Sequence, residues 1–286
     1  MGNFDAMGSP CEILLEGITQ STAKQLVESA CIEAWRIEYK FSRYVSDNIV
    51  FQINNSHGNP IRTDDETARL LDYANHCFEL TEGLFDITSG ALRQAWKFDG
   101  SENIPTLKQV EQIIPRVGWD KVTWKHHCIT LAAGMEIDFG GIGKEYAVDR
   151  TLSLLTTHIE AKHPRGVGIL VNFGGDIACG GQRLNNAPWC VGVESQLNPN
   201  AATNAITLRH GGVATSGDTR RFLIHRGERL GHILDPRTGW PIKEAPHSVT
   251  VIAQTCTLAG MMATFAMLEG SNAEQFLSEQ SGIKYW

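Results

Sequence analysis

Residues 138–146, Asp-Phe-Gly-Gly-Ile-Gly-Lys-Glu-Tyr, combine flexible backbone with a cation and are suited to chemistry on an anion. An apolar run precedes the glycines and a helical pattern follows them, which predicts a turn from a strand into a helix. Backbone N–H groups at a helix start and the Lys144 ammonium both attract a phosphate. A tight turn with a solvated lysine explains the same residues, so both interpretations stay open for this segment alone.

Two familiar nucleotide-binding motifs are absent from this segment. The phosphate loop G-x-x-x-x-G-K-[ST] needs a glycine where Asp138 stands and a hydroxyl where Glu145 stands. The dinucleotide motif G-x-G-x-x-G fails as well, because residues 144–146 contain no glycine. The segment therefore predicts an anion site that belongs to neither class.

Three further segments place polar side chains at or near predicted turns. Each has a plain structural interpretation, in which Asp176 caps a hairpin turn, Ser216 precedes a strand and His232 is a core histidine bonded to backbone. None of the three segments is decisive alone. Their polar residues are Asn172 and Asp176; Thr215, Ser216 and Asp218; and His232, Asp235 and Arg237.

The elements around these segments follow from hydrophobic spacing. Apolar residues at helical intervals begin after Ser21 and again after Thr63, where hydroxyl and acidic residues are good helix caps. The second of these helices is expected to end at Gly83. A shorter helix follows Pro105, and a further helix covers about 144–160.

From about residue 119 the pattern changes to short β-rich runs, several joined by glycine turns, which favours antiparallel pairing. The runs before the last-named helix are 121–125, 128–133 and 135–139. His126 and His127 are expected on a strand, facing opposite sides. We expect one α+β domain, residues 1–286, in which a mostly helical lobe at about 20–115 forms a ligand cleft with the sheet.

The composition excludes several function classes. With 32 acidic against 25 basic residues the net charge is −7, which argues against a general attraction to nucleic acid or to anionic membranes. No apolar run approaches the length of a membrane span, and the N-terminal residues lack a basic end followed by an apolar core. Seven scattered cysteines, never spaced C-x-x-C, indicate reduced thiols and a cytoplasmic protein.

Eight motifs occur in one order along the chain. They are AMGSPCEI (6–13), FSRYVSDN (41–48), TEGLFDITSGAL (81–92), DFGGIGKEYAVD (138–149), VNFGGDI (171–177), VATSGD (213–218), GHILDPRTGWPI (231–242) and SVTVIA (248–253). In this order and register the sequence resembles the ApbE family, the FAD:protein FMN transferases, from about residue 4 to 270.

The resemblance implies an ApbE-like fold of mostly antiparallel sheets with packed helices, and FAD in the cleft between the lobes. It implies an enzyme that cleaves FAD, joins FMN through its phosphate to a Thr or Ser hydroxyl of a target flavoprotein, and releases AMP. The matching positions that would contact FAD are Met7, Tyr44, Gly83, Leu84, Phe85, Asp86, Asp138, Lys144 and Ile233. His232 would lie close to the reacting phosphate.

The residue types agree with these implied roles. Met7, Tyr44 and Phe85 can form a thioether and aromatic wall for a flavin. Asp138 suits hydrogen bonding to adenine or ribose, and the glycine turn with Lys144 suits a pyrophosphate. The anion expected at residues 138–146 is then the pyrophosphate of FAD.

The resemblance also implies Mg²⁺ on that pyrophosphate, held by the Gly141 carbonyl and by a segment of the form A-D-x-x-x-T. The chain keeps Thr264 but has Gly260 in place of the Asp, and Ala263 where some relatives have a second acid. Because Mg²⁺ prefers carboxylate oxygens, its affinity is expected to fall. Glu145 stands where the family commonly has glycine, and we expect an outward, solvated residue there, a compensating ligand being the alternative.

Two functions are consistent with these residues. The first is an active FMN transferase with a weakened or altered Mg²⁺ site. The second is an FAD-binding protein with weak or no transferase activity, because Gly260 replaces the metal-ligand Asp. The retained His232, Lys144 and Thr264 favour the first. Gly260→Asp is then expected to tighten Mg²⁺ and to raise transfer.

Overall fold

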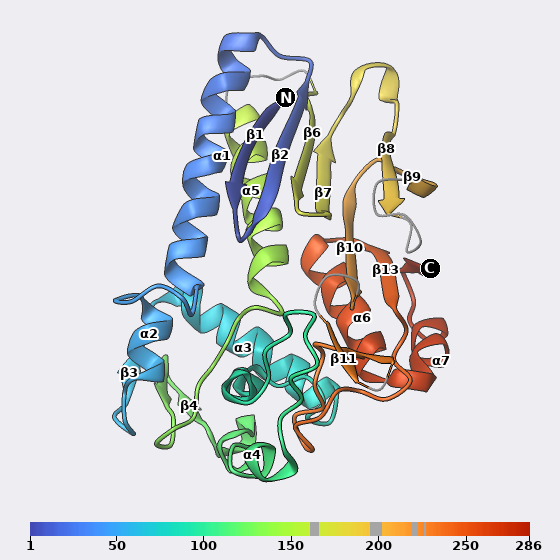
Figure 1. The fold of residues 1–286 in the computed structure, drawn as a ribbon. Coiled ribbons are helices and arrows are strands. Elements are labelled where there is room, and N and C mark those ends of the chain that lie inside the picture. The colour runs from blue at the N-terminus through green and yellow to red at the C-terminus, as the bar shows by residue number, and fades with distance from the viewer. Residues whose placement is uncertain (161–165, 195–201, 219–221, 226) are drawn as a thin grey trace.

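A seven-stranded antiparallel sheet lies at the centre of the structure, a computed structural model that describes residues 1–160, 166–194, 202–218, 222–225 and 227–286 (Figure 1). In spatial order its strands are β1 (Gly2–Ala6), β2 (Ser9–Glu16), β6 (Gly168–Phe173), β7 (Asp176–Gly181), β10 (Gly211–Gly217), β13 (Ser248–Ala253) and β14 (Lys284–Tyr285). Neighbouring strands pair antiparallel throughout.

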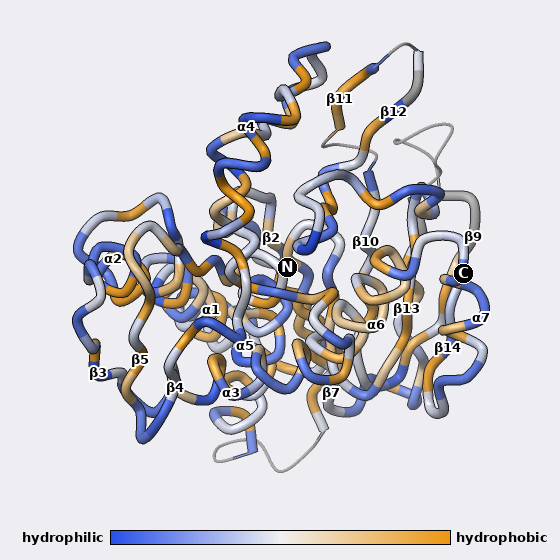
Figure 2. The backbone as a smooth tube through the Cα atoms, turned by 90° about the horizontal axis from the view of Figure 1, so that it is seen from below, coloured by the Kyte–Doolittle hydropathy of each residue, from blue (hydrophilic) through white to orange (hydrophobic). Residues whose placement is uncertain are grey.

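Three long helices pack on this sheet. They are α1 (Gln20–Phe41), α5 (Gly143–Glu160) and α6 (Cys256–Leu268), and a short α7 (Ala273–Ser278) follows α6. Helices α1 and α5 lie side by side against the β1, β2 and β6 end of the sheet, whereas α6 covers β10 and β13 (Figure 1). Most residues of α6 are buried, and its tube is mostly white to orange in Figure 2, as expected for a helix surrounded by protein.

The carboxylate of Asp149 fixes the register between α5 and α6. It accepts hydrogen bonds from the backbone N–H groups of Cys256 (2.9 Å) and Thr257 (2.8 Å) at the start of α6. These are helix-terminal N–H groups that lack a partner within their own helix. The first two turns of α5 are therefore held against the first two turns of α6.

Apart from α3, the remaining elements are short. The helical ones are α2 (Ile49–Asn54), α3 (Asp65–Leu80), α4 (Leu107–Glu111) and the 3₁₀ turns η1 (Ile87–Gln94), η2 (Ile114–Arg116), η3 (Trp119–Lys121), η4 (Leu184–Asn186) and η5 (Gly270–Asn272). Small sheets are formed by β3 (Ile61–Arg62), β5 (Cys128–Thr130) and β4 (Thr123–Lys125), by β8 (Trp189–Glu194) with β9 (Ala202–Leu208), and by β11 (Phe222–His225) with β12 (Glu228–Gly231).

The expected strand at 135–139 is wrong, because this segment has other backbone partners. Ile137 exchanges both of its backbone hydrogen bonds with the side chain of Asn54, and the Asp138 N–H donates to the Ile87 carbonyl (2.9 Å). The expectation that His126 and His127 lie on a strand is wrong as well. Both have positive φ, 51° and 59°, and form the two-residue turn between β4 and β5.

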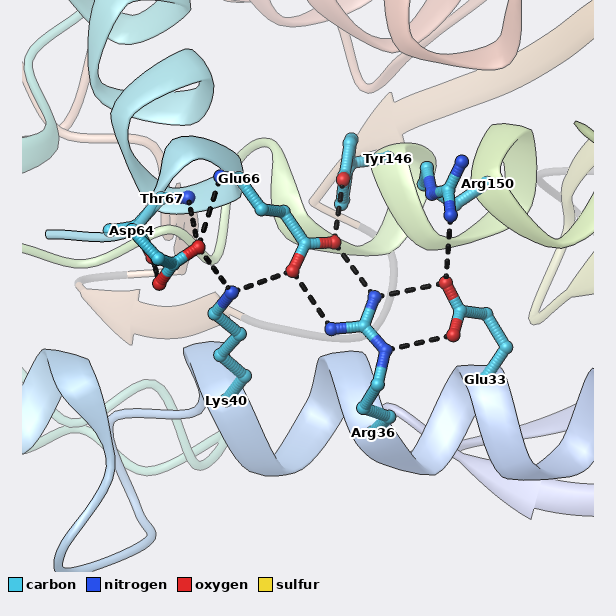
Figure 3. Close-up of polar contacts among 8 residues, drawn as sticks. All are labelled: Glu33, Arg36, Lys40, Asp64, Glu66, Thr67, Tyr146 and Arg150. Carbon is cyan, nitrogen blue, oxygen red and sulfur yellow. Dashed lines mark hydrogen bonds and ion pairs between the residues drawn. The ribbon is translucent and has the colours of Figure 1, made fainter.

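The start of α5 is tied to α1 and α3 by a network of charged side chains (Figure 3). The Arg36 guanidinium and the Lys40 ammonium of α1 each contact the Glu66 carboxylate at 2.7 Å. The Tyr146 hydroxyl of α5 donates to the same carboxylate (2.8 Å). Glu66 thus receives three donors from two helices, and the bond from Arg36 is the largest of the causes that lower its pKa.

Asp64, the N-cap of α3, extends the network. Burial acts to raise its pKa, but hydrogen bonds from Lys40 and Thr67 outweigh that effect and lower the pKa to about 2. Both carboxylates therefore stabilise the fold while they are charged. That contribution is complete above their ordinary pKa of about 4 and is lost as the pH falls towards the lowered values.

Glu66→Gln should lower the free energy of unfolding at neutral pH by about 2 kcal/mol, because hydrogen bonds to charged groups are each of that order. The wild type should also lose stability more steeply in acid than the variant does. Urea unfolding followed by circular dichroism, at neutral and acidic pH, measures both effects. Glu28→Gln, at an exposed position of α1, is the matched control, and equal loss in the two variants would contradict the network's role.

Candidate active site

Lys144 lies on the first turn of α5, directly after the glycine turn. Its ammonium contacts the Asp176 carboxylate at the start of β7, with Nζ and Oδ2 2.7 Å apart, and the Asp176 side chain is only 5% exposed. Burial acts to lower the pKa of Lys144, but the charge of Asp176 outweighs it and the pKa is raised. Lys144 is therefore a fixed cation. Its partner Asp176 was expected from the sequence to cap a hairpin turn and not to pair with a lysine.

The predicted role of Asp176 as a turn cap belongs to Asn172 instead. The Asn172 side-chain oxygen accepts the backbone N–H of Gly175 at 2.9 Å. A Cβ built on Gly174, which has φ 61°, would lie 2.6 Å from the Ser9 Cβ and 3.8 Å from the Lys144 ammonium. The glycine pair thus lets the β6–β7 turn approach both Lys144 and the β1–β2 hairpin.

Met7 lies in that β1–β2 hairpin. Together with Gly8 it forms the two-residue turn between Ala6 and Ser9, and both turn residues have positive φ, 56° and 67°. The Met7 side chain is half-buried against the main core. The hairpin turn, the β6–β7 turn and the start of α5 therefore meet at one place.

Asp138 has a partner that was not expected from the sequence. Its carboxylate pairs with the Arg43 guanidinium and also accepts the backbone N–H of Gly140 at 2.9 Å. Arg43 in turn donates to the hydroxyl of Tyr44 (2.7 Å) and lies 4.8 Å from the centre of its ring. Tyr44 is 80% exposed, so its ring is available at the surface beside the Asp138 loop.

The segment that contains Gly83, Leu84, Phe85 and Asp86 packs behind the glycine turn. Phe85 is buried, and its ring lies 3.4 Å from where a Cβ on Gly141 would be. Leu84 packs partly buried against the main core, and Gly83 has φ 86°, in the left-handed region. These residues shape the floor beneath the turn.

Asp86 is fully engaged with the protein. Its Oδ1 accepts from the backbone N–H and the hydroxyl of Thr88, both at 2.7 Å, and its Oδ2 accepts from the Trp119 N–H at 2.8 Å. Burial is the main reason that its pKa is raised. Asp86 therefore holds the turn into η1, which carries the backbone that bonds to the Asp138 loop.

Thr264 and Glu145 meet the same region from α6 and α5. The Thr264 hydroxyl bonds with the Ser216 hydroxyl of β10 at 2.8 Å. Glu145 is 8% exposed, and a Cβ built on Gly260 would lie 2.6 Å from its Cγ. The expectation of an outward, solvated Glu145 is therefore wrong, because the missing side chain at position 260 leaves room for it to turn towards α6.

These contacts form a closed ring of neighbours, which we call the α5-start cluster: Lys144, Glu145, Asp176, Thr215, Ser216, Gly260 and Thr264. Lys144 contacts Asp176, which accepts the backbone N–H of Thr215 next to Ser216. Ser216 reaches Thr264 on α6, and α6 returns to α5 at Glu145. Four elements distant in the sequence thus deliver one cation, two carboxyl groups and three hydroxyl groups, of which that of Thr215 bonds to Thr250.

His232 lies just after β12, at the same end of β10. A Cβ on the preceding Gly231 would lie 3.2 Å from the Cβ of Asp218, two residues beyond Ser216. The His232 ring meets the Phe98 ring edge to face, with centroids 6.3 Å apart. The loop that follows is held by Asp235, whose carboxylate pairs with Arg237 at 2.9 Å.

Ile233 follows His232 in this loop. Its carbonyl accepts the backbone N–H of Ile242 (3.1 Å), and its side chain packs partly buried against the main core. The loop therefore attaches to the body of the protein at Ile233, beside His232. The structure brings the 231–242 segment to the cluster's end of β10 without showing a direct contact with Lys144.

Two open surface hollows occur in the described part of the chain, and neither lies at the α5-start cluster. One, of about 310 Å³, lies beside α5 and is lined by Asp149 and Thr255 among others. The other, of about 300 Å³, is lined by Asn75 and Trp124 among others. FAD in the cleft between the lobes stays a prediction.

The cluster offers a mixed set of ligands for a cation. Among the described residues no three His, Cys, Asp or Glu side chains are arranged to hold a metal. Glu145 nevertheless has a buried Oε2 with no hydrogen-bond partner, and the hydroxyl of Thr264 and the carbonyl of Gly141 are oxygen donors. A hard cation that takes one or two carboxylates and completes its shell with other oxygens fits these residues.

Comparison with known proteins identifies the family. The sequence profile of the ApbE family matches residues 7–286. The chain belongs to the ApbE family. The resemblance predicted from the eight motifs is thereby confirmed.

Relatives in the ApbE family carry one functional name. A Haemophilus influenzae protein named FAD:protein FMN transferase is 28% identical over 259 residues, covering 86% of this chain and 73% of that protein. A Salmonella typhimurium protein of the same name is 26% identical, with coverage of 97% and 80%.

Solved ApbE structures share the fold. The crystal structure of the Thermotoga maritima ApbE protein matches with a TM-score of 0.88 and 30% identity, covering 99% of this chain and 92% of that one. The Pseudomonas stutzeri flavinyl transferase ApbE matches with a TM-score of 0.82 at 24% identity, over 99% and 89%. The predicted α+β fold with mostly antiparallel sheets is therefore confirmed.

Two further expectations concern the whole chain. None of the helices in the described ranges combines the length and the apolar character needed to cross a bilayer. All seven cysteines carry free thiols, as their spacing predicts.

Proposed function

We propose that this protein transfers FMN from FAD to a Thr or Ser hydroxyl of a target flavoprotein and releases AMP. The names of its relatives support this reaction. The observation that carries the proposal is the position of Lys144, a fixed cation on the first turn of α5, beside the glycine turn and the Met7 hairpin. A pyrophosphate with two negative charges suits such a place.

The bound FAD would extend in both directions from Lys144. The flavin would lie by Met7, Tyr44 and Phe85, where the thioether and aromatic groups give an apolar wall. The adenosine part would lie by Asp138, whose carboxylate is oriented by Arg43. The rest of the FAD-binding surface would be formed by Gly83, Leu84, Asp86 and Ile233. Asp86 would contribute by holding the turn into η1, because its carboxylate oxygens already accept hydrogen bonds from the protein.

In the reaction the acceptor hydroxyl oxygen forms a bond to the FMN phosphorus, and the bond from that phosphorus to the bridging oxygen of AMP breaks. We assign the proton of the hydroxyl to the His232 imidazole, which makes His232 the catalytic residue of the proposal. Mg²⁺, when bound by groups that include the Gly141 carbonyl and the Thr264 hydroxyl, would neutralise charge on the pyrophosphate.

The alternative is an FAD-binding protein with weak or no transfer activity, and its basis is the glycine at position 260. The Glu145 carboxyl beside Gly260 supports the transferase, because a carboxyl group is still present at that corner. Incubating the protein with FAD, Mg²⁺ and candidate flavoproteins, followed by intact-mass measurement and AMP detection, separates the two. FAD binding without transfer to any acceptor would favour the alternative.

FAD should bind at least about tenfold more tightly than FMN, because only FAD has the second phosphate that the Lys144 ammonium is proposed to contact, and tenfold corresponds to about 1.4 kcal/mol. Isothermal titration calorimetry of the two flavins against the same protein preparation measures this ratio. Riboflavin serves as the control without phosphate. Equal affinity for FAD and FMN would mean that the pyrophosphate does not bind at the start of α5.

A further inference from the structure

Glu145 and Gly260 form a matched pair across the α5–α6 contact. The carboxyl group of Glu145 reaches the space that a side chain at position 260 would need, since a Cβ there would lie 2.6 Å from Cγ and 2.7 Å from Oε1. Asp149, one turn further along α5, caps α6 at Cys256, one turn before Gly260. The antiparallel packing of the two helices therefore sets Glu145 opposite Gly260.

One oxygen of the carboxyl group at this place lacks a hydrogen-bond partner. Glu145 is 8% exposed, and its Oε2 accepts no hydrogen bond. Burial, reinforced by the charge of Asp176, raises the pKa of Glu145. The nearest cation, Lys144, is already paired with Asp176. Buried carboxylates without a partner are costly, and those that persist in proteins are paired with cations or coordinate metals.

Two further oxygen-bearing groups, the Thr264 hydroxyl and the Gly141 carbonyl, are contributed by α6 and by the turn before α5. Gly260 and Thr264 are four residues apart on α6 and so lie on one face of the helix, one turn apart. The Thr264 hydroxyl is held by Ser216, which fixes its direction. The glycine turn with the Gly141 carbonyl lies immediately before α5, within a few residues of Glu145.

We propose that Glu145, reaching across from α5, is the carboxylate with which this chain binds Mg²⁺, in the space left free by Gly260 on α6. The inference rests on the proposed function, because the family implies the metal. Glu145 then contributes the carboxylate oxygen from α5, whereas the resemblance led us to expect the acid on α6, at position 260. Gly260 is required by this arrangement, since any side chain there would displace the Glu145 carboxyl.

The expected benefit of Gly260→Asp is reversed by this geometry. The new Cβ would overlap Glu145, and a second carboxylate would face a buried one. The single variant should lose thermal stability and should not gain Mg²⁺ affinity. Moving the carboxylate back to α6 requires both changes together, Glu145→Gly with Gly260→Asp.

The test is calorimetric titration of MgCl₂ into the full chain saturated with FAD, with FAD affinity measured separately without metal. Glu145→Gln should weaken Mg²⁺ binding about tenfold or more, as the loss of a group that tunes a metal site typically does, and leave metal-free FAD affinity within about twofold. The double variant should recover most of the Mg²⁺ affinity that Glu145→Gln loses. Glu111→Gln, on exposed α4, is the control for a lost negative charge.

The outcomes separate this inference from the proposed function. If FAD binds but Mg²⁺ affinity is the same in wild type and Glu145→Gln, or if wild type binds no Mg²⁺, Glu145 is a buried acid without a metal role and the inference is wrong. If FAD does not bind at all, the proposed function is wrong. Should the double variant fail to fold, the comparison of wild type, Glu145→Gln and Glu111→Gln still decides.

Discussion

His232→Ala should lower the rate of FMN transfer on the order of 100-fold or more, which is the usual contribution of a general base. FAD affinity should stay within about threefold, because the imidazole is assigned to the acceptor hydroxyl and not to the nucleotide. The loop itself should persist, since Asp235 and the attachment at Ile233 hold it without the histidine. Single-turnover kinetics of AMP release, with FAD affinity by calorimetry, measure the two quantities.

The matched control is His158→Ala, near the far end of α5. That end lies about 20 Å along the helix axis from Lys144, at 1.5 Å per residue, and His158 is exposed. The control should transfer FMN at the wild-type rate. If His232→Ala also keeps its rate within a few fold, the histidine is structural, as its position before an apolar run would also explain.

Lys144→Ala should weaken FAD binding by about tenfold to 100-fold, because a hydrogen bond to a charged group is worth about 1.5 to 3 kcal/mol. The same change leaves the buried Asp176 carboxylate without its cation. Breaking a buried pair from one side costs about 3 kcal/mol or more of unfolding free energy, part of it avoided if Asp176 takes up a proton. Calorimetry and urea unfolding should therefore both register the substitution.

A second substitution separates binding from stability. In Lys144→Ala with Asp176→Asn both charges of this pair are removed, so neither partner is left as an unpaired buried charge and most of the unfolding free energy should return. FAD affinity should stay low, because the cation for the pyrophosphate is still missing. Recovery of FAD affinity together with stability would mean that Lys144 only holds β7 against α5.

Local signals allowed much of the fold to be predicted. Two helix starts were predicted close to their positions from cap residues near Ser21 and Thr63, and the caps in the structure are Thr19 for α1 and Asp64 for α3, each of which accepts a backbone N–H of the first turn. Antiparallel pairing followed from short runs joined by glycines. The turn at His126 and His127 was missed because non-glycine residues with positive φ leave little trace in the sequence.

The partners of the candidate site residues could not be predicted in the same way. Arg43 meets Asp138, and Asp176 meets Lys144, across elements far apart in the chain. The direction of Glu145 depends on the absence of a side chain on another helix, which no local pattern contains. The motifs therefore predicted which residues form the candidate site, whereas the contacts among them came from the packing of α5 against β7 and α6.

The network around Glu66 has a consequence for how the protein responds to heat. The cost of removing water from charged groups falls as the temperature rises, whereas the stabilisation gained from apolar burial levels off. The polar contacts of Glu66 with Arg36, Lys40 and Tyr146 hold the first turns of α5 to α1 and α3 (Figure 3). Relative to the apolar contacts, their contribution to stability should therefore be larger at high temperature than at low temperature. The difference in unfolding free energy between wild type and Glu66→Gln should widen on warming.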